Sequence, residues 1–336
     1  MESLEGALSI LLSHAKPVTD AQELPLLDAL NRIAAEDVVS PMNVPPFNRS
    51  PLDGYALHSE DIADASREHP AVVKVIGEAC AGCGEVFRPA RGEAVRVMTG
   101  APVPETCDCV IRQEDTDEGM DYAEIYAPVS HGRNICLAGE DVAAGEVLVH
   151  AGEKLTATHL AVLAGVGQAR VKVVRRVRAA LLCTGDELTQ PGQPLTFGKI
   201  YDSNQMALTA RLAELGVECV QLGELSDDPQ NVADALAHAA LEADIILTTG
   251  GVSVGKKDIF HQVLPLMGAE RLFWRIAMKP GSPLLCGLYQ DKLMICLSGN
   301  PFAALCCFEV FAVPTLRRLS GETNIDAKRV KTRLRG

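Results

Sequence analysis

Long hydrophobic runs are missing from this sequence of 336 residues, although 47% of the residues are hydrophobic. No apolar run reaches the roughly 18–20 residues that a membrane-spanning helix needs. The amino terminus, Met1-Glu2-Ser3-Leu4-Glu5, is acidic and lacks the basic segment that begins a secretory signal peptide. We therefore expect a cytoplasmic protein that is not associated with a membrane.

Positive charge is also scarce, because 31 Lys and Arg residues stand against 44 Asp and Glu residues and the formal net charge is −13. This balance argues against a general nucleic-acid-binding protein. Basic residues crowd only the end of the chain, where a solvated tail is the expected structure. They are Lys328, Arg329, Lys331, Arg333 and Arg335. The length predicts two or more domains with sizeable cores.

Cysteine is present eleven times, but the spacing lacks the density of a disulfide scaffold and an odd number cannot all pair. Cys80 and Cys83 form a C-x-x-C pair, and Cys107 and Cys109 form a C-x-C pair. A zinc or redox site is an alternative for each pair, but neither has a second pair at zinc-finger spacing. We expect mostly buried thiols in a reducing cytosol.

A glycine-rich segment, Thr248-Thr249-Gly250-Gly251-Val252-Ser253-Val254-Gly255, follows an expected strand at 243–247 and precedes an expected helix at 259–267. Glycines let a backbone pass close to a ligand, and a loop that opens a helix presents unpaired N–H groups to an anion. The segment is neither a Walker A loop nor a G-x-G-x-x-G fingerprint. It is either a phosphate-binding loop or a tight turn, and the flanking sequence must decide.

Strands and helices alternate from Val171 onward, which predicts a mostly parallel sheet with helices on both faces. The expected strands are 178–183, 217–222, 243–247, 284–287 and 293–297, and the expected helices are 203–215, 228–242, 259–267 and 301–319. Asp202 or Ser203 is the expected cap of the first helix, and Asp228-Pro229 opens the second. Ligands of such sheets bind beyond the carboxyl ends of the strands. Four loops follow strands and should share one edge and one pocket, namely 184–188, 248–255, 279–283 and 298–301.

The first half of the chain has a different pattern. It predicts a helix at 3–15, a strand at 24–26, a helix at 28–35 with Asp28 as N-cap, and an extended segment from Val38. Prolines hold residues 41–56 extended around an Asp53-Gly54 turn. An all-β insertion is expected over 57–140, with strands at 72–76, 94–98 and 109–112, before a short helix at 158–164 that ends at Gly165.

The expected pocket combines groups that suit a phosphate and a cation. Glycine loops and Lys279 suit the phosphate, and Asp186, Glu187 and Asp258 are carboxylates at the same edge. Carboxylates beside a phosphate-binding loop favour a bridging Mg²⁺ ion. His261 is expected to be structural or on the surface, and no Ser-His-Asp or Cys-His pairing is suggested.

Seven motifs occur in order along nearly the whole chain. They are Asp53-Gly54-Tyr55-Ala56, Met98-Thr99-Gly100-Ala101-Pro102, Gly139-Glu140-Asp141, Thr184-Gly185-Asp186-Glu187-Leu188, Thr249-Gly250-Gly251-Val252-Ser253-Val254-Gly255, Lys279-Pro280-Gly281 and Ser298-Gly299-Asn300-Pro301. Each motif alone is weak, but together they resemble the molybdopterin molybdenumtransferases, the MoeA family that includes the gephyrin E domain.

The resemblance implies an enzyme of molybdenum cofactor biosynthesis. Its substrates would be adenylylated molybdopterin and molybdate, and it would insert the metal and release AMP with the help of Mg²⁺. The catalytic acids would be Asp53, Asp141, Glu187 and Asp258, and the Mg²⁺ ligands Asp186, Glu187 and Asp258. The ligand-binding residues would be Thr99, Gly100, Thr184, Gly185, Asp186, Thr249, Gly250, Gly251, Ser253, Gly255, Lys279, Pro280, Gly281, Ser298, Gly299, Asn300 and Pro301.

The resemblance also implies a domain plan. Residues 1–46 and 142–172 would form an elongated, discontinuous helical and β domain, 47–141 an inserted all-β module, and 173–321 a three-layer α/β/α molybdopterin-binding domain. Residues 322–336 would be a basic tail, the stub of the C-terminal β-barrel domain that family members usually carry. Family members are homodimers whose cleft uses both subunits, which would let Asp53 and Asp141 join the α/β site. A molybdopterin adenylyltransferase would act upstream.

Departures from the family pattern leave two other interpretations. The family's Lys-Pro-Gly-Lys-Pro has Ser282 in place of the second lysine, and its Leu-Pro-Gly-Asn-Pro has Ser298 in place of the first proline. The first alternative is a molybdopterin adenylyltransferase, which shares the α/β domain but not the Pro-rich arm and β insertion. The second is a non-catalytic protein that binds molybdopterin or serves as a scaffold. Four converging carboxylates argue against it, because their repulsion is costly without a cation.

Overall fold

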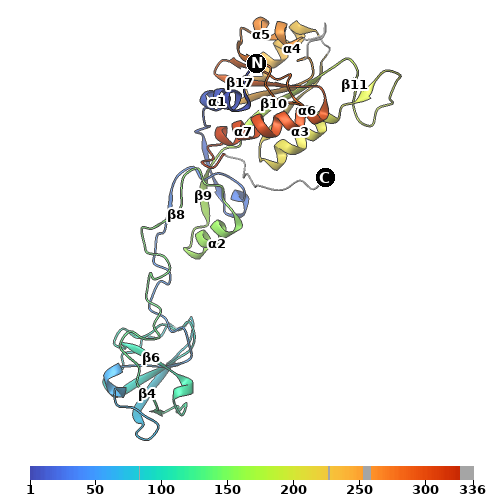
Figure 1. Ribbon diagram of the computed structural model, residues 1–336. Coiled ribbons are helices and arrows are strands. Elements are labelled where there is room, and N and C mark those ends of the chain that lie inside the picture. Colours follow the sequence, from blue (N-terminus) through green and yellow to red (C-terminus); the bar gives the residue numbers. More distant parts are fainter. Residues whose placement is uncertain (83, 226–227, 253–258, 326–336) are drawn as a thin grey trace. The chain divides into compact units, whose positions relative to one another are not determined.

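The structure is a computed structural model that describes residues 1–82, 84–225, 228–252 and 259–325 (Figure 1). The chain forms two compact units. Unit 1 comprises Met1–Asp37, Val149–Ala161 and Gln168–Gly336, and unit 2 comprises Val38–Leu148 and Val162–Gly167. In the ranges that the structure describes, no helix is both long enough and apolar enough to cross a membrane.

A six-stranded sheet forms the centre of unit 1, in the order β13-β10-β14-β17-β16-β15. Its strands are β10 (Arg178–Thr184), β13 (Glu218–Leu225), β14 (Ile245–Thr249), β15 (Glu270–Trp274), β16 (Leu285–Tyr289) and β17 (Lys292–Leu297). Neighbours from β13 to β17 pair in parallel, whereas β16 is antiparallel to both β17 and β15. Since β15 then runs in the same direction as β17, β16 is the reversed strand of a mixed sheet.

Helices cover both faces of this sheet because the strands of its centre are apolar on both sides. In β10, Ala179 and Leu181 pack into one core and Ala180 and Leu182 into the other. The first core also receives α1 (Leu4–His14), α3 (Ser203–Glu214), α6 (Pro301–Cys307) and α7 (Val313–Leu319). The second core receives α4 (Pro229–Ala239) and α5 (Phe260–Met267). The predicted helices of this region are therefore confirmed.

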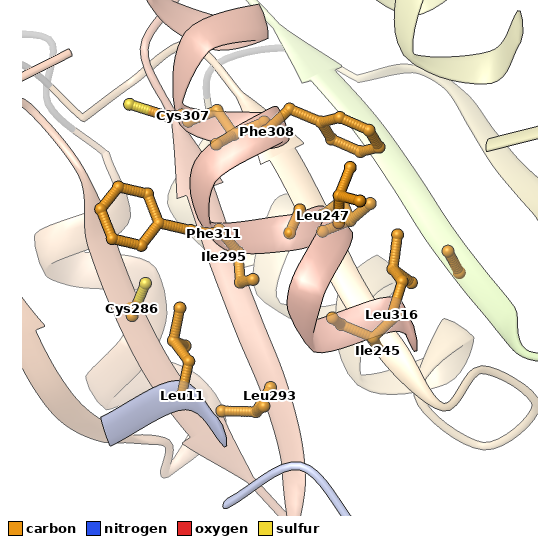
Figure 2. Packing of buried hydrophobic residues seen from close by; sticks show 14 of the residues in the cluster. Leu11, Ile245, Leu247, Cys286, Leu293, Ile295, Cys307, Phe308, Phe311 and Leu316 are labelled. Carbon is orange, nitrogen blue, oxygen red and sulfur yellow. The ribbon is translucent and has the colours of Figure 1, made fainter. Parts of the chain in front are cut away.

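The last helical segment contains one irregularity. A π-helical turn, η4 (Phe308–Ala312), joins α6 to α7. Phe308 and Phe311 of this turn are fully buried against Ile295, Leu247 and their neighbours (Figure 2). The prediction of a continuous helix to Leu319 is confirmed apart from this wider turn, which the sequence pattern does not indicate.

Capping residues fix the starts of two helices that follow sheet strands. The Asp202 side chain accepts a hydrogen bond from the Gln205 amide at 3.0 Å and caps α3. Asp228 accepts from the Asn231 amide at 2.9 Å and caps α4, whose first residue is Pro229. Both starts agree with the capping signals in the sequence.

A smaller β layer in unit 1 pairs β1 (Ala21–Pro25) with β9 (Arg170–Val174) in antiparallel fashion. The predicted helix at 158–164 is confirmed as α2 (Ala157–Gly165). The predicted helix at 28–35 is wrong, because only a 3-10 turn, η1 (Leu27–Ala29), forms there. Ile33 and Ala34 instead form bridges with distant residues of the chain. Such long-range pairing outweighs local helix propensity.

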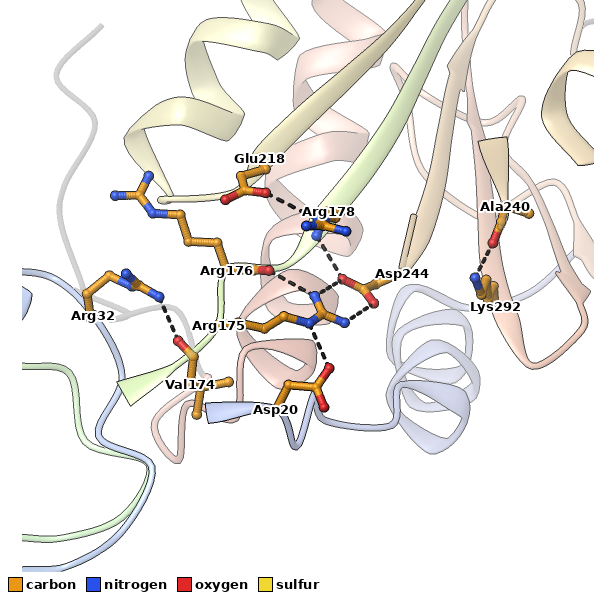
Figure 3. A network of polar contacts seen from close by, with 10 residues as sticks. All are labelled: Asp20, Arg32, Val174, Arg175, Arg176, Arg178, Glu218, Ala240, Asp244 and Lys292. Atoms are coloured by element: carbon orange, nitrogen blue, oxygen red, sulfur yellow. Dashed lines mark hydrogen bonds and ion pairs between the residues drawn. The ribbon is translucent and has the colours of Figure 1, made fainter. Parts of the chain in front are cut away.

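An ion-pair network links the start of the sheet to the β1–β9 layer (Figure 3). Arg175 donates to Asp244 at 2.8 Å from each of two nitrogens and to Asp20 at 3.0 Å. The Arg178 amide donates to Asp244 at 2.8 Å. Burial acts to raise the pKa of Asp244, but these hydrogen bonds outweigh it and lower the pKa below its ordinary value. The Asp244 carboxylate therefore stays ionised and holds the start of β14 to Arg175, which follows β9.

An arm formed by residues 188–201 extends from unit 1 (Figure 1). Its two ends pair as the short parallel strands β11 (Leu188–Thr189) and β12 (Ile200–Tyr201). Phe197 within the arm is fully exposed.

Unit 2 is built on a five-stranded sheet in the order β6-β3-β5-β4-β7. Its strands are β3 (Gly54–Leu57), β4 (Ala71–Ala79), β5 (Glu93–Val97), β6 (Cys109–Arg112) and β7 (Tyr122–Ile125), with 3-10 turns η2 (Ser59–Ile62) and η3 (Gln113–Asp115). The predicted strands of the insertion are confirmed. A separate pairing of β2 (Val38–Val39) with β8 (Val147–Val149) brings the two ends of this unit together.

Candidate active site

The carboxyl ends of β10, β14 and β17 lie side by side, since these strands are parallel neighbours. β15 ends at the same edge because it runs in the same direction. The loops that follow these strands therefore leave the sheet at one edge, as the strand order in the sequence predicted.

Three of the loops touch one another through their backbones. Gly250 has φ of 88°, and a Cβ added there would lie 2.2 Å from the carbonyl oxygen of Thr184. The Thr184 hydroxyl donates to the Thr249 carbonyl at 3.3 Å, and the Gly250 amide donates to the Leu297 carbonyl at 3.2 Å. A Cβ at Gly299 would lie 3.5 Å from the Gly250 Cα. Only glycine allows the first of these approaches.

Asn204 anchors the third loop and was not identified from the sequence. Its side-chain nitrogen donates to the Gly299 carbonyl at 2.9 Å from the first turn of α3. The Asn300 side chain accepts from the Ala303 amide at 3.1 Å and caps α6. The 298–301 loop is thus held at both ends. The signal for Asn204 was its place just after the Asp202 cap, which the sequence analysis used only to locate the helix.

Two exposed carboxylates follow β10. The Glu187 carboxylate folds back over Gly185, because a Cβ at Gly185 would lie 2.8 Å from both of its oxygens. The Ile200 amide donates to the Glu187 carbonyl at 2.8 Å, and Lys199 donates from Nζ to the Asp186 carbonyl at 2.6 Å. The arm therefore ties down the backbone of both acids and leaves their side chains toward solvent.

A cavity of 530 Å³ opens beside these acids. Its lining includes Cys183, Gly185, Asp186, Leu188, Gln190, Lys199, Asp202 and Leu225. Burial raises the pKa of the Cys183 thiol to about 12, so this thiol stays protonated at neutral pH and is a poor nucleophile. Lys199 and Asp202 are polar residues of this cavity that sequence reasoning missed, since nothing in the arm's sequence shows that it returns to the end of β10.

The 279–281 loop is anchored on α6. Gly281 is buried at φ of 105°, and its carbonyl accepts from the Cys307 thiol at 3.3 Å. A Cβ at Gly281 would lie 2.6 Å from the Cys307 sulfur. Lys279 and Pro280 remain exposed. The loop therefore presents the lysine to solvent on a fixed backbone.

Arg275 is a second cation near that loop that the sequence analysis did not select. It follows β15 directly with φ of 70°, an uncommon conformation for a residue with a side chain. Its guanidinium carbon lies 5.4 Å from the centre of the Trp274 ring. Within the described part of the chain, its buried Nε has no hydrogen-bond partner. An uncommon backbone and an unsatisfied cationic donor at the loop-bearing edge mark it as a candidate ligand-binding residue.

In unit 2, Asp53 and Thr99 lie in direct contact. The Asp53 carboxylate accepts from the Thr99 amide at 2.6 Å and from its hydroxyl at 2.8 Å. These two bonds, the amide first, lower the pKa of Asp53 below its ordinary value. Gly54, the first residue of β3, permits close pairing with β6, because a Cβ there would lie 1.9 Å from the Ile111 carbonyl oxygen. Asp53 and Thr99, which were predicted from separate motifs, thus lie in one place in the structure, and Gly100 follows Thr99 directly.

Asp141 is held differently. It is exposed, and its amide donates to the Val44 carbonyl at 3.0 Å, while the Gly139 amide donates to the Pro45 carbonyl at 3.0 Å. For the residues described, no hydrogen bond or ion pair joins Asp141 to Asp53 or Thr99. The Pro-rich arm therefore positions the Asp141 turn through its backbone and through two side chains, since Asn48 Oδ1 accepts from the Ala138 amide at 2.9 Å and Asn43 Oδ1 accepts from the Ala144 amide at 2.8 Å.

Three residues of the predicted site, Ser253, Gly255 and Asp258, lie outside the described residues. No group of three or more His, Cys, Asp or Glu side chains suited to a metal is found among the residues that are described. Burial raises the pKa values of the Cys107 and Cys109 thiols to about 12, which fits the interpretation of these two as buried thiols. His261 packs edge-on against Trp274 with 4.5 Å between ring centres, which fits a structural role.

Family models match both parts of the chain. Residues 2–167 match the model of the MoeA N-terminal region (domain I and II), and residues 180–318 match the model of a probable molybdopterin binding domain. A molybdopterin molybdenumtransferase from Haemophilus influenzae is 37% identical over 96% of this chain and 78% of its own. One from Bacillus subtilis is 37% identical over 90% of this chain and 72% of its own.

Solved structures agree with the sequence matches. A molybdopterin biosynthesis MoeA protein from Pyrococcus horikoshii aligns with a TM-score of 0.85 and 36% identity, over 95% of this chain and 80% of that one. A second structure under that description aligns with a TM-score of 0.83 and 30% identity, over 97% of this chain and 81% of that one.

Proposed function

Since this chain belongs to the MoeA family of molybdopterin molybdenumtransferases, it is a transferase of molybdenum cofactor biosynthesis, and we propose that it inserts molybdenum from molybdate into adenylylated molybdopterin with release of AMP. The observation that carries this proposal is the meeting of three backbone loops, around Thr184, Gly250 and Gly299, at the edge that also presents Lys279. Such an edge suits an extended anionic ligand.

Cations at this edge support binding of the substrate's phosphate groups. Lys279 is exposed on an anchored loop, and the Nε of Arg275 has no hydrogen-bond partner among the described residues. A guanidinium can bind two phosphate oxygens at once, whereas an ammonium acts as a point charge. We propose that Arg275 offsets the cation that Ser282 removes from the family's pattern.

Mg²⁺ would be held by Asp186 and Glu187, together with Asp258. The residues fit this ion, because Mg²⁺ in phosphate sites is usually bound through one or two carboxylates plus substrate oxygens, and Asp186 and Glu187 are exposed neighbours at the end of β10. When bound, the ion would withdraw negative charge from the phosphoanhydride that is cleaved. It would also relieve the repulsion between these acids and an anionic substrate.

Asp53 would serve as a carboxylate that remains ionised during the reaction. Two hydrogen bonds from Thr99 stabilise its charged form. An ionised carboxylate can orient a substrate or accept a proton, but it cannot donate one. We propose that Asp141 and Glu187 act in the same reaction, in a homodimer, on substrate supplied by a molybdopterin adenylyltransferase.

The match of residues 2–167 to the MoeA N-terminal region supports the transferase over the adenylyltransferase interpretation. A non-catalytic binding protein differs from both enzymes because it would bind the substrate without converting it. The deciding experiment measures AMP release from adenylylated molybdopterin by the purified chain with Mg²⁺, in the presence and absence of molybdate.

Molybdate-dependent release of AMP is the expected result. A chain that binds adenylylated molybdopterin but releases no AMP, with or without molybdate, would instead be a binding protein. Glu187→Gln keeps the size of the side chain and removes its charge, and it should abolish release. Glu214→Gln, at an exposed position of α3, is the matched control and should leave release unchanged.

A further inference from the structure

A small cavity of 70 Å³ lies in unit 1 at the edge of the sheet opposite the candidate active site. Val177 and Val217 line it, and they directly precede β10 and β13, so it lies at the amino ends of these strands. The rest of its wall comes from the segment after η1, the turn after α3 and the end of α7. The cavity is therefore separate from the loops that carry the proposed reaction.

Cations dominate the lining of this cavity, although the whole chain carries a net charge of −13. Its charged lining residues are Arg32, Lys154, Arg175, Arg176, Arg317 and Glu322. Arg175 is neutralised by Asp20 and Asp244, and Arg317 lies 3.8 Å from Glu322. In the described part of the chain, neither Arg32 nor Arg176 has a carboxylate within ion-pair distance.

Arg32 is the strongest indication of an anion site among these residues, because its charged side chain is buried and the residue is only 8% exposed. Its Nη2 donates to the Val174 carbonyl at 2.8 Å (Figure 3), and the Gln22 amide oxygen, turned toward it, accepts at 2.7 and 3.2 Å. Both acceptors are neutral. Burial and then the positive charge of Arg176 lower the pKa of Arg32, while Glu218 acts in the opposite direction.

A buried cation with neutral acceptors and a cationic neighbour is electrostatically unfavourable unless an anion is added. The size of the cavity limits what that anion can be. At about 30 Å³ for each water-sized group, it holds roughly two such groups, which suits one small oxyanion and excludes a nucleotide or a pterin. Guanidinium groups match the oxygens of such an anion in geometry and charge.

We propose that this cavity is a binding site for a single small tetrahedral oxyanion of the phosphate, sulfate or molybdate class, held between Arg32 and Arg176. The ion joins the β1–β9 layer to the start of the central sheet. Because it binds only the folded chain, it stabilises that chain in proportion to the logarithm of its concentration above Kd.

The test measures the melting temperature of the full chain against increasing sodium phosphate, with sodium chloride at equal ionic strength as the reference. Parallel titrations use sulfate and molybdate to rank the anions. The melting temperature should rise with the logarithm of the concentration of a divalent oxyanion above its Kd, and it should not do so with chloride. Arg176→Gln should weaken the response about tenfold or more, because it removes charged hydrogen bonds to the ion.

Two controls locate the effect. Arg178→Gln removes a nearby exposed arginine that pairs with Glu218 and does not line the cavity, so the response should remain. Lys279→Ala removes a cation at the opposite edge and should also leave it. The proposal is overturned if the wild-type melting temperature rises no more with phosphate than with chloride, or if Arg176→Gln leaves the rise unchanged.

Discussion

Asp53 shows how a single residue is prepared by its surroundings. Its carboxylate has two donors from one threonine, and both favour the charged form. The depressed pKa means that Asp53 stabilises the fold fully above its unfolded pKa, near 3.9, and that this contribution is lost as pH falls through the lower folded value. Asp53 should therefore stay ionised throughout the neutral pH range.

Substitution Asp53→Asn keeps an oxygen that can accept from Thr99 but removes the charge. It should lower the unfolding free energy slightly, because the two hydrogen bonds from Thr99 lose their charged acceptor, and it should lower molybdate-dependent AMP release by about 10²-fold or more. The measurements are urea unfolding and AMP release. The exposed acid Asp64 of the same unit provides the control, Asp64→Asn, which should match wild type in both. An active Asp53→Asn protein would remove this residue from the reaction.

Thr99→Val removes the hydroxyl and keeps the branched shape and the backbone donor. The pKa of Asp53 should rise toward its ordinary value but stay below it, since the amide bond is the larger cause of the depression. A carboxyl-carbon NMR titration of Asp53 in both proteins measures this. An unchanged titration midpoint would show that the hydroxyl does not stabilise the carboxylate.

Residues found only in the structure are those whose partners are distant in sequence. Asp53 and Thr99 were predicted from separate motifs, but their contact could not be, because it depends on the pairing of β3 with β5. Lys199 and Arg275 were missed for a similar reason. Lys199 belongs to an arm that returns to β10, and Arg275 is identified by its backbone angle and an unsatisfied donor.

Among the elements, the loops at the sheet edge depend on close backbone approach. At Gly250, substitution by Ala should destabilise the chain by about 1–3 kcal/mol beyond the strain at positive φ. The reason is that the new Cβ would clash with the Thr184 carbonyl oxygen. Gly192→Ala is the matched control, at φ of 92° with open space around it. Urea unfolding of both variants gives the difference, and equal losses would contradict the close approach.

The half-buried ion pair of Asp244 with Arg175 can be compared in stability with an exposed ion pair. Asp244→Asn should lower the unfolding free energy by about 1–3 kcal/mol, because it leaves Arg175 with a weakened partner in a half-buried place. Asp291→Asn breaks an exposed pair with Lys16 and should cost about 0–1 kcal/mol. The difference should vanish as pH falls through the folded pKa of Asp244. Equal losses at neutral pH would contradict this assignment.

Element prediction succeeded where the signal was local. Asp202 and Asp228 marked helix starts, and short apolar runs marked the strands of the two larger sheets. It failed at 28–35, where Asp28 and the apolar spacing favoured a helix, because Ile33 and Ala34 instead form bridges with the distant residues Lys154 and Val173. The π-helical turn at Phe308 is likewise set by packing in the core rather than by local propensity.

For the whole molecule, the proposed dimer predicts a mass about twice the 35.8 kDa of one chain. Light scattering at micromolar concentration in roughly 0.15 M salt, where surface charges are screened beyond about 8 Å, measures it. A single-chain mass under these conditions would contradict the homodimer.

Residues 38–148 should fold by themselves, because the two apolar clusters that contain Tyr55 and Val95 draw on this segment alone. A fragment with these bounds is expected to show one cooperative thermal transition by circular dichroism. Adding Tyr55→Ala removes a fully buried ring and should lower that transition sharply, by about 3–5 kcal/mol of stability. A fragment without any cooperative transition would show that unit 2 needs the rest of the chain.

The pairing of β2 with β8 has a consequence for how such a gene can change. Since residues 38–148 begin at β2 and end within β8, and these two strands pair, an insertion, deletion or exchange of the intervening segment requires no change in the path of the remaining chain. This segment can therefore be replaced as a whole. Its turns around Asp53 and Asp141 can diversify, or new chain ends can be opened within it by circular permutation, while the six-stranded sheet keeps its connectivity.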